Sequence, residues 1–230
     1  MTVAAKRPFV YVNMAMTVDG KITSASREYP GFTSAEDRIR MDRLRATADA
    51  LMVGAGTVRA DNPAWHVRTK EVRERRLAEV RSGGPHRVLV SASARLPGDS
   101  RFFDTKHGGR SILVTSRRAP EENLTTFDGR AEILRFGDER VDLTAALAAL
   151  RDDGVERLLV EGGAELNWTL FEHDLVDELY VTLAPALLGG SDAPTLLEGA
   201  GWPMDAQRRL RLLEVDREGD EIYLRYSVRT

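Results

Sequence analysis

The chain has 230 residues, of which 42% are hydrophobic and 30% charged, and its formal net charge is −3. This composition is typical of a globular protein with a sizeable core, and the small net charge indicates no nucleic-acid or acidic-membrane partner. Because the sequence contains no cysteine, disulfides, zinc–thiolate sites, iron–sulfur clusters and cysteine nucleophiles are excluded. No signal-peptide pattern and no apolar run of roughly 20 residues is found, so we expect a cytoplasmic protein.

Short apolar runs alternate with helical patterns along the chain. In chain order, strands are expected at Phe9–Met16, Ala50–Val53, Arg87–Val90, Ser111–Thr115, Ala131–Arg135, Val155–Val160, Val176–Leu183, Arg208–Val215 and Glu221–Val228. Helices are expected at Ala35–Ala46 after the N-cap Ser34, from Asp142 or Thr144 to Leu150, and at Glu165–Phe171.

This alternation predicts an α/β fold with a mostly parallel central sheet flanked by helices. The last two strands are joined by a turn at Arg217–Asp220 and predict an antiparallel hairpin at the edge. Since no Pro/Gly/Ser linker interrupts the pattern, we expect one domain over residues 1–230.

One segment, Thr69–Ser82, is densely charged, with lysine and arginine set among glutamates. The basic residues alone would favour an anion-binding patch. The interspersed acids instead favour a solvated surface helix with ion pairs three and four residues apart.

Two glycine-rich turns follow predicted strands. Gly54 and Gly56 begin the first, which continues through Thr57 to Asp61, and Glu161-Gly162-Gly163 forms the second. Glycine lets backbone N–H groups approach a ligand, and the N-terminus of a following helix favours phosphate. Either turn alone is better explained by a tight strand-to-helix connection. Together they favour a dinucleotide site at the carboxyl ends of the strands.

Other chemistries find little support in the residues. The four histidines have no metal-ligand spacing, and no G-x-S-x-G motif is present, so we expect no metal and no serine nucleophile. Hydride transfer from a nicotinamide needs neither a metal nor a protein nucleophile, and it fits this inventory best.

Three stretches, in this order, resemble the reductase of riboflavin biosynthesis, the family of RibD C-terminal domains and stand-alone archaeal diaminopyrimidine reductases. The stretches are Val12–Ile22, Gly54–Pro63 with Arg68, and Leu159–Trp168 followed by Leu175–Glu178 and a turn from Pro185 to Gly190. The resemblance covers nearly the whole chain and is greater to the stand-alone archaeal form. It implies a dihydrofolate-reductase-like fold.

The resemblance also implies site residues. The positions implied to contact NADPH are Ala15, Gly54, Gly56, Thr57, Asp61, Ser91, Arg95, Gly162, Gly163, Ala164, Glu165 and Leu166. Those implied to face the substrate are Asp19, Lys21, Arg45, Trp65, Arg68 and Glu161. Arg45 or Arg68 would fork onto a ribose 5′-phosphate, with Lys21 as a second cationic candidate. Surface or turn positions remain the competing interpretation for Arg45 and Asp19.

The implied reaction is NADPH-dependent reduction of a ribosylamino-pyrimidine 5′-phosphate to its ribitylamino form, with hydride delivered to C1′. Proton transfer must accompany this step, and Asp19, Glu161 or a bound water could serve. Most of the catalysis would come from holding the nicotinamide against C1′.

The chain departs from the family at two places. Tyr29-Pro30-Gly31-Phe32 replaces a segment that lies near the substrate in the family and often carries a serine with a basic residue or tryptophan. After the strand that ends at Val90, Ser91-Ala92 replaces Asp-Ser. Ser91, Ser93 and Arg95 could still hold a 2′-phosphate, which favours NADPH over NADH.

Two alternatives remain open: a paralogue that reduces a pterin, dihydrofolate or another heterocycle, and a nucleotide-binding protein without turnover. The resemblance further implies a homodimer, for which Val176–Leu183 and the terminal strands are apolar enough. The diaminopyrimidinone and the amino-uracil forms of the substrate are equally compatible with the sequence.

Overall fold

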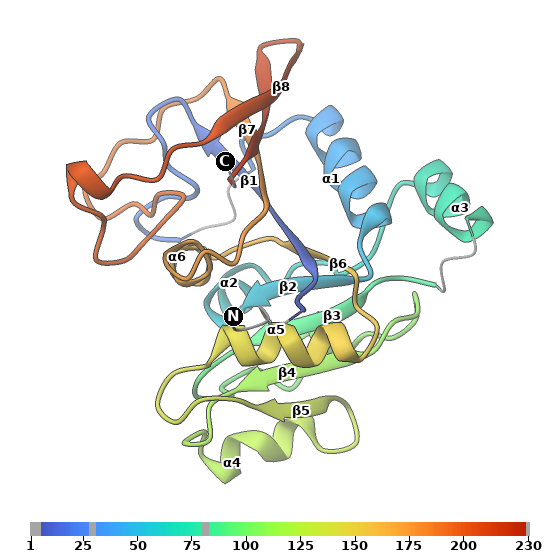
Figure 1. The fold of residues 1–230 in the computed structure, drawn as a ribbon. Helices are drawn as coiled ribbons and strands as arrows, with labels where there is room; N and C mark the ends of the chain where they lie inside the picture. Colours follow the sequence, from blue (N-terminus) through green and yellow to red (C-terminus); the bar gives the residue numbers. More distant parts are fainter. Residues whose placement is uncertain (1–5, 28–30, 80–82, 229–230) are drawn as a thin grey trace. The chain divides into compact units, whose positions relative to one another are not determined.

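The computed structural model describes residues 6–27, 31–79 and 83–228, and these form six α-helices, three short 3₁₀ helices and nine strands (Figure 1). They fall into two compact units. Unit 1 comprises Asp42–Leu159 together with the chain up to Phe9, and unit 2 comprises Val10–Met41 and the chain from Val160 onward. In the described ranges no helix is both long and apolar enough to cross a membrane.

Unit 1 contains a parallel sheet with the strand order β5-β4-β3-β2-β6. Its strands are β2 (Ala50–Gly54), β3 (His86–Val90), β4 (Ser111–Thr115), β5 (Glu132–Arg135) and β6 (Arg157–Val160). The central strands β2, β3 and β4 are almost entirely buried, and each contains at least three consecutive apolar residues. That pattern arises because helices cover both faces of a parallel sheet.

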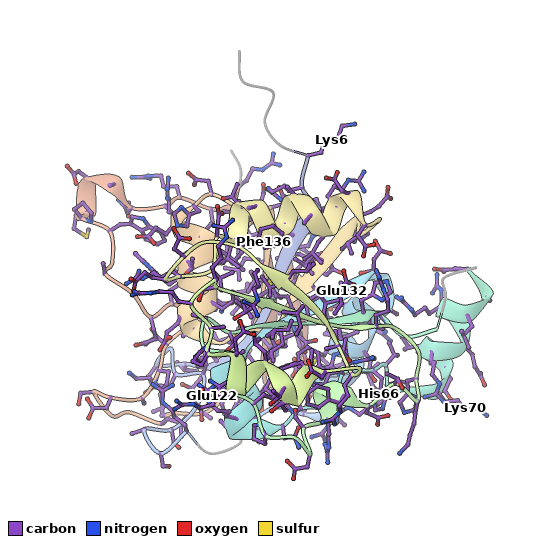
Figure 2. All side chains as sticks on the ribbon, turned by 90° about the horizontal axis from the view of Figure 1, so that it is seen from below. Lys6, His66, Lys70, Glu122, Glu132 and Phe136 are labelled. Atoms are coloured by element: carbon purple, nitrogen blue, oxygen red, sulfur yellow. The ribbon has the colours of Figure 1, made fainter. Side chains whose placement is uncertain are left out.

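The helices of unit 1 lie on opposite faces of this sheet. Figures 1 and 2 show α5 (Leu143–Asp152) on one face and α2 (Ala55–Asp61) on the other. Asp142 caps α5 by accepting a hydrogen bond from the Ala145 amide at 3.0 Å, as the sequence predicts. Two further helices, α3 (Lys70–Ala78) and α4 (Glu121–Leu124), complete this unit.

Unit 2 contains the strand order β1-β7-β9-β8. Its strands are β1 (Phe9–Thr17), β7 (Glu178–Ala184), β8 (Arg211–Glu218) and β9 (Glu221–Ser227). Strand β7 pairs in parallel with β1 and antiparallel with β9, and β8 pairs antiparallel with β9. Helix α6 (Ala164–Glu172) and the first half of α1 (Ala35–Thr47) also belong to this unit.

The predicted mostly parallel sheet with an antiparallel C-terminal hairpin is confirmed. The predicted hairpin turn is confirmed at Gly219 and Asp220 but is shorter than predicted, because Arg217 and Glu218 extend β8. Gly219 has a φ of 59°, which permits such a two-residue turn. Strand β7 lies between β1 and β9, so its two edges are already paired within the chain.

The charged segment forms α3, and its ion pairs Lys70–Glu74 and Arg75–Glu79 confirm a largely solvated helix. Arg76 is an exception that the charge pattern did not indicate, since it is 4% exposed. Its guanidinium donates to the carbonyl oxygens of three residues at or just after the end of α1 and of one residue between α3 and β3: Arg45, Ala46, Ala48 and Gly83. Tyr29, Pro30 and the end of the charged segment at Ser82 lie outside the described residues.

Candidate active site

The first glycine turn lies at the carboxyl edge of the unit 1 sheet. Gly54 ends β2 and pairs with Val90 at the end of β3, so α2 and the turn that begins at Ser91 start from the same edge. The side chain of Arg59 on α2 donates to the Arg95 carbonyl at 3.1 Å and links the two segments. Unit 1 therefore places the candidates between Gly54 and Asp61 and those between Ser91 and Arg95 at the same edge of its sheet.

Within this edge the individual candidates differ in exposure. Thr57 and Asp61 are half-buried on α2, and burial raises the pKa of the Asp61 carboxyl. Ser91 is 7% exposed, whereas Arg95 and Ser93 are exposed. Gly56 lies inside α2, and a β-carbon there would meet no atom within 4 Å. The space above Gly56 is thus open in unit 1.

The loop that follows α2 carries two predicted substrate residues with different surroundings. Trp65 is 4% exposed and packs edge-on against Phe102, with ring centroids 5.5 Å apart. Its Nε1–H has no hydrogen-bond partner among the described residues. Arg68 is exposed, and no hydrogen bond or ion pair of its guanidinium is found in the described ranges.

Arg45, the third candidate of this group, is 2% exposed and donates from Nη1 to the His66 carbonyl at 3.0 Å. The alternative interpretation of Arg45 as a surface residue of a helix is therefore wrong. Of the two arginines that could fork onto a phosphate, Arg68 is the accessible one.

Two hollows of unit 1 adjoin this loop. The larger has a volume of about 350 Å³ and is lined by basic residues and glycines, among them His66, Arg73, Lys106 and His107. The smaller, of about 120 Å³, is lined by residues that include Trp65, Arg101 and Asp104. In the described part of the chain, no group of three His, Asp or Glu side chains could hold a metal ion.

In unit 2 the second glycine turn lies against β1. A β-carbon on Gly162, whose φ is 81°, would lie 3.0 Å from the sulfur of Met14. Ala15 follows Met14 on β1 and pairs with Thr182 on β7. Gly162 is thus required both by its backbone conformation and by the close approach of Met14.

Helix α6 starts directly after this turn. Its N-cap residue Gly163 provides no side-chain hydrogen bond to the first-turn amides of Ala164, Glu165 and Leu166. A helix N-terminus without a side-chain cap is a ready-made anion site, because its amides and the helix dipole both favour negative charge. This end of α6 therefore fits the diphosphate of a dinucleotide. Glu161, immediately before the turn, is half-buried.

Asp19 has a different environment from that of a general acid. Its carboxylate accepts hydrogen bonds from the Thr17 hydroxyl at 2.6 Å and from the Gly189 and Leu188 amides at 2.6 and 3.2 Å. The Thr17 and Gly189 hydrogen bonds lower the pKa of Asp19 to about 2. A carboxyl with this pKa is ionised at neutral pH and has no proton to give.

Lys21 contacts the segment Ala193–Gly199, which no sequence motif indicated. The Lys21 ammonium donates to the Ala193 carbonyl at 2.9 Å. At the other end of the segment, the Glu198 amide donates to Ala164 in α6 at 3.2 Å, and a β-carbon on Gly199 would overlap the Trp168 ring. The segment links the β1 turn to the start of α6. The close packing of Gly199 against Trp168 explains why this position is glycine.

Comparisons with known proteins identify the family. The RibD C-terminal domain family matches residues 8–224. The 2,5-diamino-6-ribosylamino-4(3H)-pyrimidinone 5′-phosphate reductase of Archaeoglobus fulgidus is 39% identical, over 93% of this chain and 95% of that protein. The protein of the same name from Methanothermobacter thermautotrophicus is 37% identical, over 97% and 99% of the two chains.

Two solved structures show the fold. A pyrimidine reductase-like protein from Corynebacterium diphtheriae has a TM-score of 0.82 at 22% identity, over 96% of this chain and 91% of that one. Dihydrofolate reductase from Enterococcus faecalis, complexed with NADP(H), has a TM-score of 0.50 at 10% identity, over 95% of each chain. The matched family spans nearly the whole sequence, and the two relatives exceed one-third identity over almost their full length. The chain therefore belongs to the RibD C-terminal domain family.

Proposed function

We propose that the protein is an NADPH-dependent reductase that converts 2,5-diamino-6-ribosylamino-4(3H)-pyrimidinone 5′-phosphate to its ribitylamino form. The observation that carries this proposal is the near full-length similarity to two relatives whose names state this substrate. The uncapped N-terminus of α6 after Gly162-Gly163 supports the cofactor part.

The chain's own residues have positioning tasks in this proposal. NADPH, when bound, supplies the hydride that reduces C1′ of the sugar. By the family resemblance, the first-turn amides of α6 would hold the cofactor diphosphate, and Ala15 on β1 would contact the cofactor through its backbone. The same resemblance assigns Thr57 and Asp61 as residues that would contact the cofactor, and Ser91 with Arg95 as residues that would bind a 2′-phosphate. Arg68 binds the substrate phosphate through its accessible guanidinium.

The proton that accompanies hydride transfer needs a separate source. Since three donors hold Asp19 as a carboxylate with a pKa of about 2, we assign it the task of fixing the Leu188–Gly189 backbone. Glu161 or a water bound beside it is the proposed proton donor to the substrate nitrogen. Lys21 donates a hydrogen bond to the Ala193 carbonyl and supplies positive charge near the turn that follows β1.

The test is NADPH oxidation, followed at about 340 nm, where reduced nicotinamide absorbs. The purified chain is assayed with the diaminopyrimidinone ribosyl phosphate, the amino-uracil ribosyl phosphate and dihydrofolate. Turnover of the diaminopyrimidinone, abolished or strongly weakened in Arg68→Ala, supports the proposal. Turnover of dihydrofolate alone would move the protein to the paralogue alternative, and NADPH binding without any turnover would favour a non-catalytic protein.

We further propose that the protein is a homodimer that pairs through β8. All eight residues of β8 are exposed, among them the apolar Leu212 and Val215, and β8 is the last strand in the order of unit 2. Two copies of β8 paired antiparallel about a twofold axis would place Arg211 of each opposite Glu218 of the other, which is charge-complementary. Sedimentation equilibrium of the wild type and of Val215→Lys tests this, and a monomeric wild type would refute it.

The cytoplasmic location and the absence of nucleic-acid and membrane partners remain predictions from the sequence.

A further inference from the structure

The backbone of the loop His66–Thr69, which carries Arg68, is held by a buried carboxylate that no sequence motif indicated. Asp42 on α1 is 2% exposed. Its Oδ2 atom accepts hydrogen bonds from the Arg68 amide at 3.0 Å, the Thr69 amide at 2.6 Å and the Thr69 hydroxyl at 2.7 Å. Three donors on one carboxylate oxygen form a charge-assisted anchor, which is roughly twice as strong as neutral hydrogen bonds.

The same contacts set the start of α3. Thr69 is the N-cap residue of α3, and its hydroxyl makes no capping hydrogen bond but donates to Asp42. The Thr69 carbonyl accepts from the Arg73 amide at 3.0 Å and begins the helix. Asp42 therefore joins α1 to the first turn of α3 at the residue that follows Arg68.

Three carbonyl groups of the loop accept hydrogen bonds from arginines. Arg45, one turn after Asp42 on α1, donates to the His66 carbonyl at 3.0 Å. Arg73 on α3 donates to the Val67 and Arg68 carbonyls, both at 3.3 Å. Figure 2 labels His66 and Lys70, which bracket the loop. The backbone at Arg68 is thus held on both its amide and its carbonyl side, while its guanidinium stays exposed.

We propose that Asp42 is a positioning residue for substrate binding: it fixes the backbone at Arg68 so that the exposed guanidinium is preorganised for the ribose 5′-phosphate. The inference rests on the proposed function, because it assigns Arg68 to that phosphate. Preorganisation matters here because an arginine forks onto a phosphate only in a defined orientation, and a displacement of about 1 Å can weaken a site severely.

The test compares Asp42→Ala, Asp42→Asn, Arg68→Ala and the double variant Asp42→Ala/Arg68→Ala. We expect Asp42→Ala to raise KM for the ribosylamino phosphate about tenfold while kcat changes less than about threefold and NADPH affinity is unchanged. Asp42→Asn keeps one carbonyl acceptor and should restore most of the loss. In the Arg68→Ala background, Asp42→Ala should change KM by less than about twofold, because its effect passes through Arg68.

Asp49→Ala is the matched control. Asp49 also lies in unit 1, and its Oδ2 accepts from two backbone amides, those of Glu156 and Arg157, at 3.0 and 2.9 Å. Its removal costs hydrogen bonds of the same kind without touching the Arg68 loop. We expect this variant to lower thermal stability and leave KM unchanged, which separates positioning from a general loss of stability.

A second readout does not depend on turnover. The dissociation constant for ribose 5-phosphate, measured by titration calorimetry, should rise about tenfold in Asp42→Ala and show the same non-additivity with Arg68→Ala. Equal losses in both backgrounds, or an unchanged dissociation constant in Asp42→Ala, would overturn the inference. A wild-type chain that binds ribose 5-phosphate and turns over none of the substrates would instead overturn the proposed function, and the calorimetric cycle would still decide the role of Asp42.

Discussion

The Thr182 hydroxyl on β7 donates a 2.6 Å hydrogen bond to the Asp37 carboxylate in the first turn of α1. Both residues lie in unit 2, and Asp37 is 9% exposed. Beside them, Glu221 accepts from the Ser34 hydroxyl at 2.6 Å and the Tyr223 hydroxyl at 2.5 Å. Unit 2 thus packs α1 on its sheet through a buried polar cluster with two carboxyl groups.

This cluster predicts a pH-dependent stability for Asp37→Asn. Burial, with a contribution from nearby Glu221, raises the pKa of Asp37 above its ordinary 3.8, although the Thr182 and Thr33 hydrogen bonds lower it. The folded state therefore keeps the proton to a higher pH than the unfolded state. Wild-type stability falls as the pH rises from about 3.8 through the raised value. Asparagine lacks this titration, so the melting temperature of Asp37→Asn relative to wild type should increase over that window.

Calorimetric scans between about pH 4 and 8 measure this difference. Asp205→Asn is the control, since Asp205 is an exposed residue of unit 2. A difference between Asp37→Asn and wild type that does not vary with pH would contradict the prediction.

Arg76→Ala should be strongly destabilising. The buried guanidinium donates to four carbonyl oxygens, with the shortest bonds to Ala48 at 2.6 Å and Ala46 at 2.8 Å. Without it these carbonyls lose charge-assisted donors, and we expect the free energy of unfolding to fall by about 3 kcal/mol. Urea denaturation gives this value.

The neighbouring Arg75→Ala provides the comparison. The Arg75 side chain is 83% exposed and, among the described residues, pairs only with Glu79 one turn along α3. An exposed pair of this kind contributes about 0.5 kcal/mol or less. If both variants lost the same stability, the assignment of Arg76 as a buried anchor would be wrong.

Gly199→Ala should destabilise the Ala193–Gly199 segment. A β-carbon at Gly199 would overlap the Trp168 ring, and Trp168 is itself 8% exposed, with its ring centroid 4.5 Å from that of the tilted Trp202 ring. Overpacking of this kind costs about 1–3 kcal/mol. Gly98→Ala, where the nearest atom is the end of a flexible arginine at 3.9 Å, should leave the melting temperature nearly unchanged. Equal melting temperatures for the two variants would show that the segment moves freely away from Trp168.

Protonation of His66 should lower the stability of the folded protein as the pH falls below about 6.5. Burial, with the neighbouring His107, Arg45 and Arg68 charges, lowers the pKa of His66 from 6.5 to about 4. Unfolding therefore takes up a proton between about pH 6.5 and 4, so this contribution to stability is present above pH 6.5 and is lost as the pH falls.

His66→Gln should flatten the decline in melting temperature over this range. The exposed His173→Gln should not alter the slope. An unchanged slope in His66→Gln would mean that the His66 ring, stacked at 3.9 Å on His107, titrates normally.

Much of the secondary structure was predictable because it depends on local pattern. The predicted bounds of three elements match the observed bounds within a residue or two: the helices capped by Ser34 and Asp142 and the strand Ser111–Thr115. The exact turn of the C-terminal hairpin was not predictable, because the pairing of Arg217 with Ile222 depends on the register between β8 and β9.

The sequence by itself determined the family, the alternation of strands and helices and the two glycine-rich turns, because these reside in short ordered motifs and in local periodicity. Only the tertiary structure decided which charged residues are accessible. Burial and backbone hydrogen bonds depend on contacts between segments far apart in the chain. Through such contacts, Arg76 and Asp42 bind distant backbone groups, and Asp19 accepts hydrogen bonds as a carboxylate. Arg68 stays exposed.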